Sequence, residues 1–165
     1  MIRRAFNELS AREVLALAMD VERNNAERLL RLAETYDRDV PQLHQFFLHL
    51  HKEELGHMGL LEALWRKKFG SASPPDVREF DVPDVVEAVE VEHGEHMLFD
   101  DLDPQTALGM VYEAERRAAS FYSDAIASTD DKDLQKLFAE LRDFEEDHIE
   151  RLSNLKSGGE GSTNG

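Results

Sequence analysis

The sequence predicts an all-α protein, a four-helix bundle made of two antiparallel helix pairs that one long crossover joins. Four long segments carry apolar residues at helical spacing and have recognisable ends. Short polar turns connect the first segment to the second and the third to the fourth, which favours antiparallel neighbours. The crossover, about residues 71–102, separates the two pairs.

The first helix is expected to begin after Ser10, because Glu13 stands three residues later in a capping-box pattern. Its apolar periodicity continues to about Tyr36. The second helix begins near Pro41 and runs to about Phe69, just before a glycine that favours a helix end.

The third helix opens at Asp103 and Pro104, a typical combination of an N-cap residue and a first-turn proline. It runs to about Ser128. The fourth helix begins near Asp131 and is expected to end by Lys156.

The crossover starts with a Ser-Pro-Pro stretch at residues 73–75 and contains a candidate short helix, Val82–Met97. A four-helix bundle with one long crossover is the ferritin-like arrangement. We therefore expect one domain over residues 1–156 and a flexible, Gly/Ser-rich tail over residues 157–165.

The amino-acid composition excludes several classes of partner and of chemistry. The chain has 165 residues, 41% of them hydrophobic, which is sufficient for a single packed core. A net charge of -16 argues against nucleic acid as a partner, since phosphates would be repelled. No cysteine is present, which excludes disulfides, thiolate catalysis and iron–sulfur centres. Signal-peptide and membrane-spanning patterns are missing, so we expect a cytoplasmic protein with no membrane partner.

An internal repeat is the strongest signal. The second and fourth helices match in residue type at seven seam positions, at an offset of 91 residues: Leu43, Phe47, Leu50, Glu54, His57, Leu61 and Leu64 against Leu134, Phe138, Leu141, Glu145, His148, Leu152 and Leu155. The first and third helices match more loosely at an offset of 93: Leu15, Ala18, Glu22, Asn25 and Leu29 against Leu108, Val111, Glu115, Ala118 and Tyr122. The chain therefore resembles a duplicated helix pair.

Each apolar seam is interrupted at its middle by a carboxylate, and two seams carry a histidine one turn later. Burying an ion without a partner in such an interior has a desolvation penalty of roughly several kcal/mol. Two divalent cations would balance four carboxylates, and oxygen ligands with two imidazoles suit iron or manganese and tolerate zinc. The predicted metal ligands are Glu22, Glu54, His57, Glu115, Glu145 and His148.

Two less specific interpretations compete with a metal site. Glu90 and His93 form a third Glu-x-x-His, in the crossover, and are best explained as a solvated surface pair. A buried polar network paired by arginines is the structural alternative for the whole cluster. The seams carry no Arg or Lys near these levels, which disfavours it.

These motifs resemble the rubrerythrin and bacterioferritin branch of the ferritin-like superfamily over about residues 10–156. Glu54-Leu-Gly-His57 and Glu145-Glu-Asp-His148 match its paired motifs, and the segment 115–122, Glu-Arg-Arg-Ala-Ala-Ser-Phe-Tyr, is similar to its third-helix signature. The resemblance implies bridging roles for Glu54 and Glu145. It further implies terminal carboxylates and capping histidines, namely Glu22, Glu115, His57 and His148.

Three departures separate this chain from those relatives. Without cysteines it lacks a rubredoxin module, so a peroxidase would need an external electron donor. Ala118 replaces an additional rubrerythrin glutamate one turn after the third-helix ligand. Leu55 replaces the methionine that ligates haem in bacterioferritin, so no haem is expected.

The leading functional hypothesis is a di-iron oxidoreductase that oxidises Fe(II) with dioxygen or hydrogen peroxide, as a ferroxidase or a peroxide scavenger. Oxygenation of an organic substrate is a third reaction, and it would need a pocket. The alternative class is a non-enzymatic bundle for metal binding, iron storage or interaction. Tyr122 lies two turns from Glu115 on the same seam; a core role is favoured over a hydrogen bond to a ligand or a one-electron step, and Tyr112 is a second candidate.

The candidate crossover helix carries an apolar and imidazole stripe: Val82, Val85, Val86, Val89, His93 and His96. Its expected use is to cover the bundle or to dock on a partner subunit. An accessory metal site using Glu92, His93 and His96 is the alternative. The family resemblance implies a homo-oligomer, most simply a homodimer.

Overall fold

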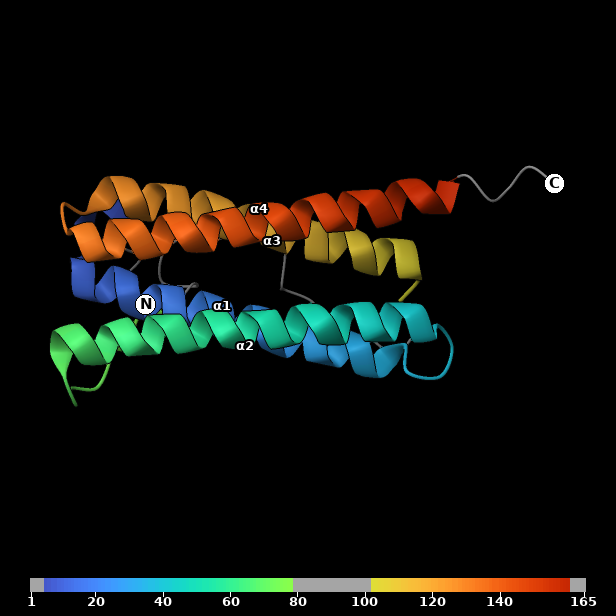
Figure 1. Cartoon of the computed structure of the whole chain (residues 1–165), viewed down its shortest axis with the longest axis horizontal. Coiled ribbons are helices and arrows are strands. Elements are labelled where there is room, and N and C mark those ends of the chain that lie inside the picture. Colours follow the sequence, from blue (N-terminus) through green and yellow to red (C-terminus); the bar gives the residue numbers. More distant parts are fainter. Residues whose placement is uncertain (1–4, 79–101, 161–165) are drawn as a thin grey trace.

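The computed structural model describes residues 5–78 and 102–160. After a short 3-10 helix, η1 (Phe6–Glu8), it contains four long helices: α1 (Ala11–Thr35), α2 (Pro41–Phe69), α3 (Pro104–Ser128) and α4 (Lys132–Glu160). Their axes run alongside one another (Figure 1). The candidate helix Val82–Met97, the third Glu-x-x-His motif and the accessory metal site lie outside the described residues.

Local chemistry sets the helix ends. The Ser10 hydroxyl accepts a hydrogen bond from the Glu13 backbone N–H at 3.2 Å, and the Glu13 carboxylate accepts one from the Ser10 N–H at 2.8 Å. This capping box satisfies donors that an isolated helix start leaves open. Gly70 ends α2 with a φ of 63°, a backbone conformation that favours glycine. At the start of α3, Asp103 accepts from the backbone N–H groups of the first turn.

The fourth helix continues beyond its expected end. It was predicted to stop by Lys156, but α4 runs to Glu160, so the beginning of the expected tail is helical. Ser157 lies in this added segment, and its hydroxyl donates to the Ser153 carbonyl at 3.0 Å. The composition rule missed this extension because Ser and Gly are only weakly unfavourable at a helix end.

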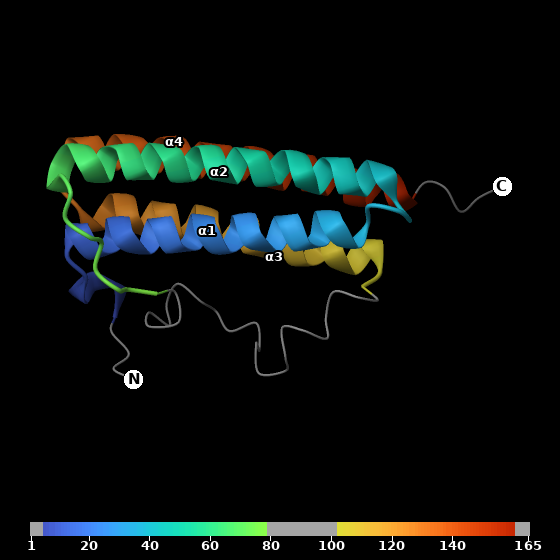
Figure 2. The same cartoon turned by 90° about the horizontal axis from the view of Figure 1, so that it is seen from below.

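The bundle has two layers of two helices. The principal packing partners are α1 with α2 and α3 with α4, and the pairs meet through α1 against α3 and α2 against α4. Figure 2 shows α2 and α4 in one layer and α1 and α3 in the other. The repeat extends to the helix bounds: adding 93 to those of α1 gives α3, and adding 91 to those of α2 gives α4. The predicted fold class is confirmed.

Two apolar clusters flank the middle of the bundle. One includes Leu15, Leu61 and Phe138, and the other includes Leu32, Phe47 and Leu152. The matched seams supply most of this core, except at their last position. There Leu64 is half-buried and Leu155 is 41% exposed.

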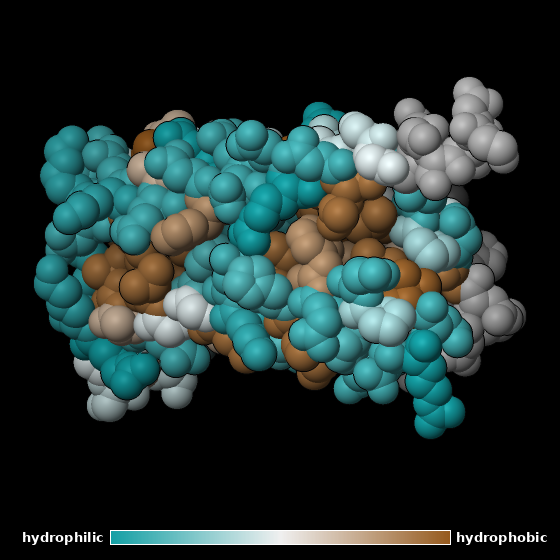
Figure 3. Space-filling view, turned by 45° about the vertical axis from the view of Figure 1, so that its right-hand side comes forward, coloured by the Kyte–Doolittle hydropathy of each residue, from teal (hydrophilic) through white to brown (hydrophobic). Residues whose placement is uncertain are grey.

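The outer surface is mostly hydrophilic, with apolar side chains in separate groups on the face that Figure 3 shows. Among the described residues the exposed large apolar side chains are Leu30, Leu55, Leu60, Phe144 and Leu155. Within the described part of the chain, each helix is too polar to form a membrane span.

Candidate metal centre

Buried polar side chains from all four helices meet between the two apolar clusters. Glu22 comes from α1, Glu115 from α3, and each of α2 and α4 contributes a glutamate and a histidine one turn apart. All are 5% exposed or less: Glu22, Glu54, His57, Glu115, Glu145 and His148. The six residues that the seams predicted to converge are therefore together in the structure.

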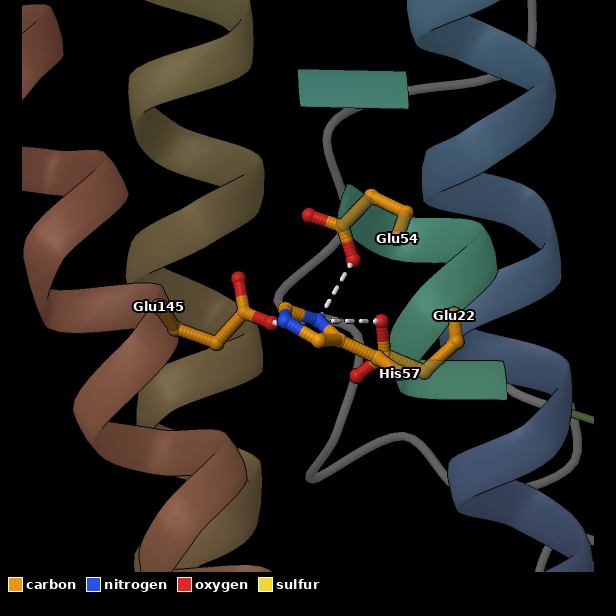
Figure 4. Close-up of side chains that lie close together, drawn as sticks. All are labelled: Glu22, Glu54, His57 and Glu145. Atoms are coloured by element: carbon orange, nitrogen blue, oxygen red, sulfur yellow. Dashed lines mark hydrogen bonds and ion pairs between the residues drawn. The ribbon is translucent and has the colours of Figure 1, made fainter. Parts of the chain in front are cut away.

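His57 forms the centre of one group. Its Nδ1 lies 3.2 Å from Glu54, 3.3 Å from Glu145 and 3.4 Å from Glu22. Figure 4 shows Glu145 reaching from the opposite helix pair to this imidazole. All four side chains thus direct an electron-pair donor into one small volume.

His148 forms the centre of the second group. Its Nδ1 lies 3.1 Å from Glu54, 3.4 Å from Glu115 and 3.6 Å from Glu145. In each group the ligand atoms lie within 4.8 Å of one another. Because Glu54 and Glu145 belong to both groups, the two sets of ligands share their central carboxylates.

The electrostatics of the metal-free cluster follow from its burial. Burial, together with the neighbouring Glu54, holds the pKa of Glu22 well above its usual value; burial and Glu145 do the same for Glu115. Although burial opposes it, contact with three carboxylates raises the pKa of His57 to about 12, and the pKa of His148 rises for the same reason. Two neutral acids and two imidazolium ions therefore hold four protons inside the bundle.

The remaining carboxylates carry the compensating charge. Despite burial, close polar contacts with Glu22 and both imidazoles lower the pKa of Glu54. Against burial and the charge of Glu54, close polar contacts with Glu115 and both imidazoles lower the pKa of Glu145. Two carboxylate charges then balance the two imidazolium charges, which keeps the metal-free interior neutral.

Four buried carboxylate oxygens still lack a hydrogen bond of suitable geometry: Oε2 of Glu22, Oε1 of Glu54 and both oxygens of Glu145. Each lies 3.1–3.6 Å from an imidazole Nδ1, but one N–H can point at only one acceptor. Buried oxygens without a partner cost free energy, and a cation removes that cost because it can bind several of these oxygens at once. The residues present therefore fit a bound metal.

Tyr122 touches this cluster directly. Its hydroxyl donates a hydrogen bond to Oε1 of Glu22, and its side chain is fully buried. Burial raises the pKa of the phenol well above its usual value, so Tyr122 remains a neutral donor. Of the two tyrosines that the sequence offered, this one contacts a predicted ligand.

One contact escaped the sequence interpretation. Nε2 of His148 lies 3.1 Å from Oε2 of Glu53, and that carboxylate also accepts from Arg151 at 2.7 Å. Glu53 lies beside the inward-facing seam and not on it, so the periodicity of the seam does not include it. Its signal is a mismatch in the repeat, since the residue 91 positions later is Phe144.

Fold and site together define a ferritin-like four-helix bundle with a buried carboxylate–histidine cluster of a kind that binds metal. The rubrerythrin family model matches residues 13–156. This chain therefore belongs to the rubrerythrin family, as its motifs predicted, and its cluster is compatible with a di-iron site.

Two solved structures share the fold. An uncharacterised conserved protein from Magnetospirillum magnetotacticum MS-1 has 22% identity and a TM-score of 0.72, over 91% of this chain and 95% of its own. A hypothetical protein from Pyrococcus furiosus has 22% identity and a TM-score of 0.69, over 92% of this chain and 91% of its own. No curated protein matches the chain. At this identity, the likeness supports the bundle architecture alone.

Proposed function

We propose that this protein binds two iron ions and oxidises Fe(II) with dioxygen or hydrogen peroxide. One observation carries the proposal: two sets of four ligand atoms, each set within 4.8 Å, share Glu54 and Glu145. Paired sites that share carboxylates would suit two adjacent cations, because the two oxygens of Glu54, like those of Glu145, face different imidazoles.

The ligand roles follow from the two groups. Glu22 and His57 would complete one position, and Glu115 and His148 the other, each through a carboxylate oxygen and an imidazole Nδ1. Two divalent ions would balance the four ionised carboxylates. Iron or manganese suits this mixed oxygen and nitrogen set, and the family supports iron.

The protein's own contribution is shielding, orientation and protons. The apolar clusters on either side keep bulk water from the middle of the bundle. Tyr122 holds Glu22 by its hydrogen bond, and the raised pKa values of His57 and Glu115 store protons when the metal is absent. Iron, when bound, would supply the one-electron change between its ferrous and ferric states.

The reaction balances with either oxidant. Oxidation of two ferrous ions releases two electrons, which with two protons convert one hydrogen peroxide into two waters. The same electrons and protons convert one dioxygen into one hydrogen peroxide. A catalytic cycle with peroxide also needs an external reductant that returns the ferric ions to the ferrous state.

Rapid mixing tests this proposal. Anaerobic protein with two equivalents of Fe(II) is mixed with dioxygen or peroxide, and ferric absorbance is followed. We expect oxidation faster than in buffer for the wild type and near the buffer rate for Glu145→Ala, which removes a ligand from both groups. Glu146→Ala, at the adjacent exposed position, should behave as the wild type.

Two results separate the proposal from its alternative. Two bound metal ions without faster oxidation would assign the protein to the non-enzymatic metal-binding class. Oxidation that is equally fast in Glu145→Ala would place the chemistry outside this cluster.

A further inference from the structure

The duplicated helix pairs differ beside the metal centre, next to the two shared glutamates. Glu53 precedes Glu54 on α2, whereas Phe144 stands at the matching position before Glu145 on α4. One turn after His148 and His57, Arg151 of α4 matches Leu60 of α2 at the same offset of 91 residues. A carboxylate and a guanidinium on one side thus correspond to two apolar side chains on the other.

The polar pair holds His148. Oε2 of Glu53 lies 3.1 Å from Nε2 of the imidazole, while Nδ1 faces the cluster. The Arg151 guanidinium donates to the same Glu53 oxygen at 2.7 Å and lies 3.0 Å from Asp147. Glu53 is therefore anchored from the protein surface and fixes which ring nitrogen of His148 points inward.

The apolar pair surrounds His57 differently. The Phe144 ring stacks on the His57 imidazole with centroids 5.0 Å apart and planes at 23°. Phe144 is 41% exposed and Leu60 is 40% exposed. None of the hydrogen bonds found among the described residues involves Nε2 of His57, so on this outer side the ring is held by stacking and not by a carboxylate.

This difference has a chemical consequence for metal binding. A carboxylate that accepts the far N–H of a ligating imidazole fixes its tautomer and makes the ligating nitrogen more basic. Stacking on an aromatic ring fixes only the plane of the imidazole. An imidazole with a carboxylate partner is therefore the stronger metal ligand.

The two terminal glutamates, Glu22 and Glu115, also differ in their strength as metal ligands, and again the His57 side is the weaker. The Tyr122 hydroxyl donates to Glu22, and the residue that matches Tyr122 at an offset of 93 is Leu29, which offers no such donor toward Glu115. A hydrogen bond to a carboxylate takes up part of the charge that it would otherwise give to a cation. Glu22 is thus the weaker terminal ligand.

We infer that Glu53 is a positioning residue that makes the two metal positions unequal. The position of Glu115 and His148 binds a divalent cation more tightly and fills first. The position of Glu22 and His57 is weaker and exchanges its ion. This inference rests on the proposed two-metal function and adds an order of loading to it.

Titration of the metal-free protein with Co²⁺, followed by visible absorption, measures the binding of the first and of the second ion as separate steps. We expect two unequal steps in the wild type. Glu53→Gln should weaken the tight step about 10- to 100-fold, the usual effect of losing such a partner, and leave the weak step unchanged. Glu62→Gln, which removes a surface carboxylate paired with Arg66 on the same helix, should change neither step.

Introducing the same Glu and Arg pair beside His57 tests whether such a pair strengthens a metal position. Phe144→Glu combined with Leu60→Arg introduces the polar pair beside His57, at two positions that are already exposed. The weak step should become about 10-fold tighter or more, which a merely structural role for Glu53 would not produce. Anomalous diffraction with one equivalent of Co²⁺ should locate the ion at Glu115 and His148 in the wild type.

Several results would overturn this inference. They are equal affinities in the wild type, a first ion at Glu22 and His57, or a Glu53→Gln variant that changes both steps alike or neither. Failure of the proposed function gives a different result: the wild type binds no Co²⁺, or binds two ions in order and does not oxidise Fe(II).

Discussion

The hydroxyl of Tyr122 on α3 donates a hydrogen bond to Glu22 on α1, so one contact joins the two helix pairs at the centre of the bundle. Both side chains are 0% exposed. The contact therefore links the stability of the bundle to the state of a predicted metal ligand.

Removal of this hydroxyl should destabilise the metal-free protein. Tyr122→Phe leaves a buried oxygen of Glu22 without its donor, and we expect the free energy of unfolding to fall by about 1–3 kcal/mol. Urea unfolding in the presence of a chelator measures the loss. Tyr112→Phe, at a half-buried ring beneath Lys156, should change the value by no more than about 0.5 kcal/mol. Equal losses in the two variants would contradict the prediction.

Glutamine should replace Glu22 with little effect on metal-free stability, because burial already keeps this carboxyl protonated. We expect Glu22→Gln to remain within about 1 kcal/mol of the wild type. Glu54→Gln should cost about 3 kcal/mol or more, since it removes an ionised partner of two imidazolium groups. Chelator-treated protein in urea gives both values, and a larger loss for Glu22→Gln would refute the assigned proton positions.

Metal loading should expel protons. In the metal-free state the imidazoles of His57 and His148 are charged and the carboxyls of Glu22 and Glu115 are neutral, since all four pKa values are raised. Metal ligands must lose these protons, so filling both positions at pH 7 should release about four. Calorimetric titration with Mn²⁺ in buffers of different ionisation enthalpy counts them. Release of one proton or none would contradict the charge assignment.

Stability should change with pH in opposite directions with and without metal. The folded-state pKa of His57 is about 12, far above the unfolded value of 6.5, so its contribution is complete below pH 6.5 and is lost as the pH rises. The raised pKa values of Glu22 and Glu115 act in the same direction above pH 4.5. The melting temperature of the metal-free protein should therefore fall between pH 7 and pH 9.

Bound metal reverses this dependence, because its ligands are deprotonated in the folded state and metal binding strengthens as protons become scarcer. At a constant free Mn²⁺ concentration, the stabilisation by metal should increase between pH 6 and pH 8. Thermal unfolding at each pH, with chelator or with Mn²⁺, measures both trends. Parallel curves for the two states would exclude coupling between the cluster's protons and metal binding.

Much of the architecture could be predicted from local patterns. The capping box at Ser10, Pro41 at the start of α2 and Asp103 before α3 all correspond to observed helix boundaries. These signals act within one turn of the chain, so they can be recognised without knowing the fold. The end of α4 was predicted too early, because Ser and Gly cost little in the last turn of a helix and do not mark its end.

The candidate site was predictable for the side chains on the seams and not for those beside them. Glu54 faces inward with its apolar neighbours, whereas Glu53 is rotated by about 100° around the helix, away from the seam. The contact of Glu53 with His148 spans 95 residues of sequence. No spacing rule relates two such positions on different helices.

The order of residues along the chain was sufficient to predict four helices, their pairing, their duplication and six polar side chains in an apolar interior. Helical periodicity and caps are properties of neighbouring residues, and a buried charge needs compensation wherever it lies. The folded bundle alone established that Glu54 and Glu145 serve both groups, that each Nδ1 points inward, and that Glu53 and Phe144 make the two halves different. These features depend on how far each helix is rotated and how closely it approaches its partners, which packing across the whole core decides.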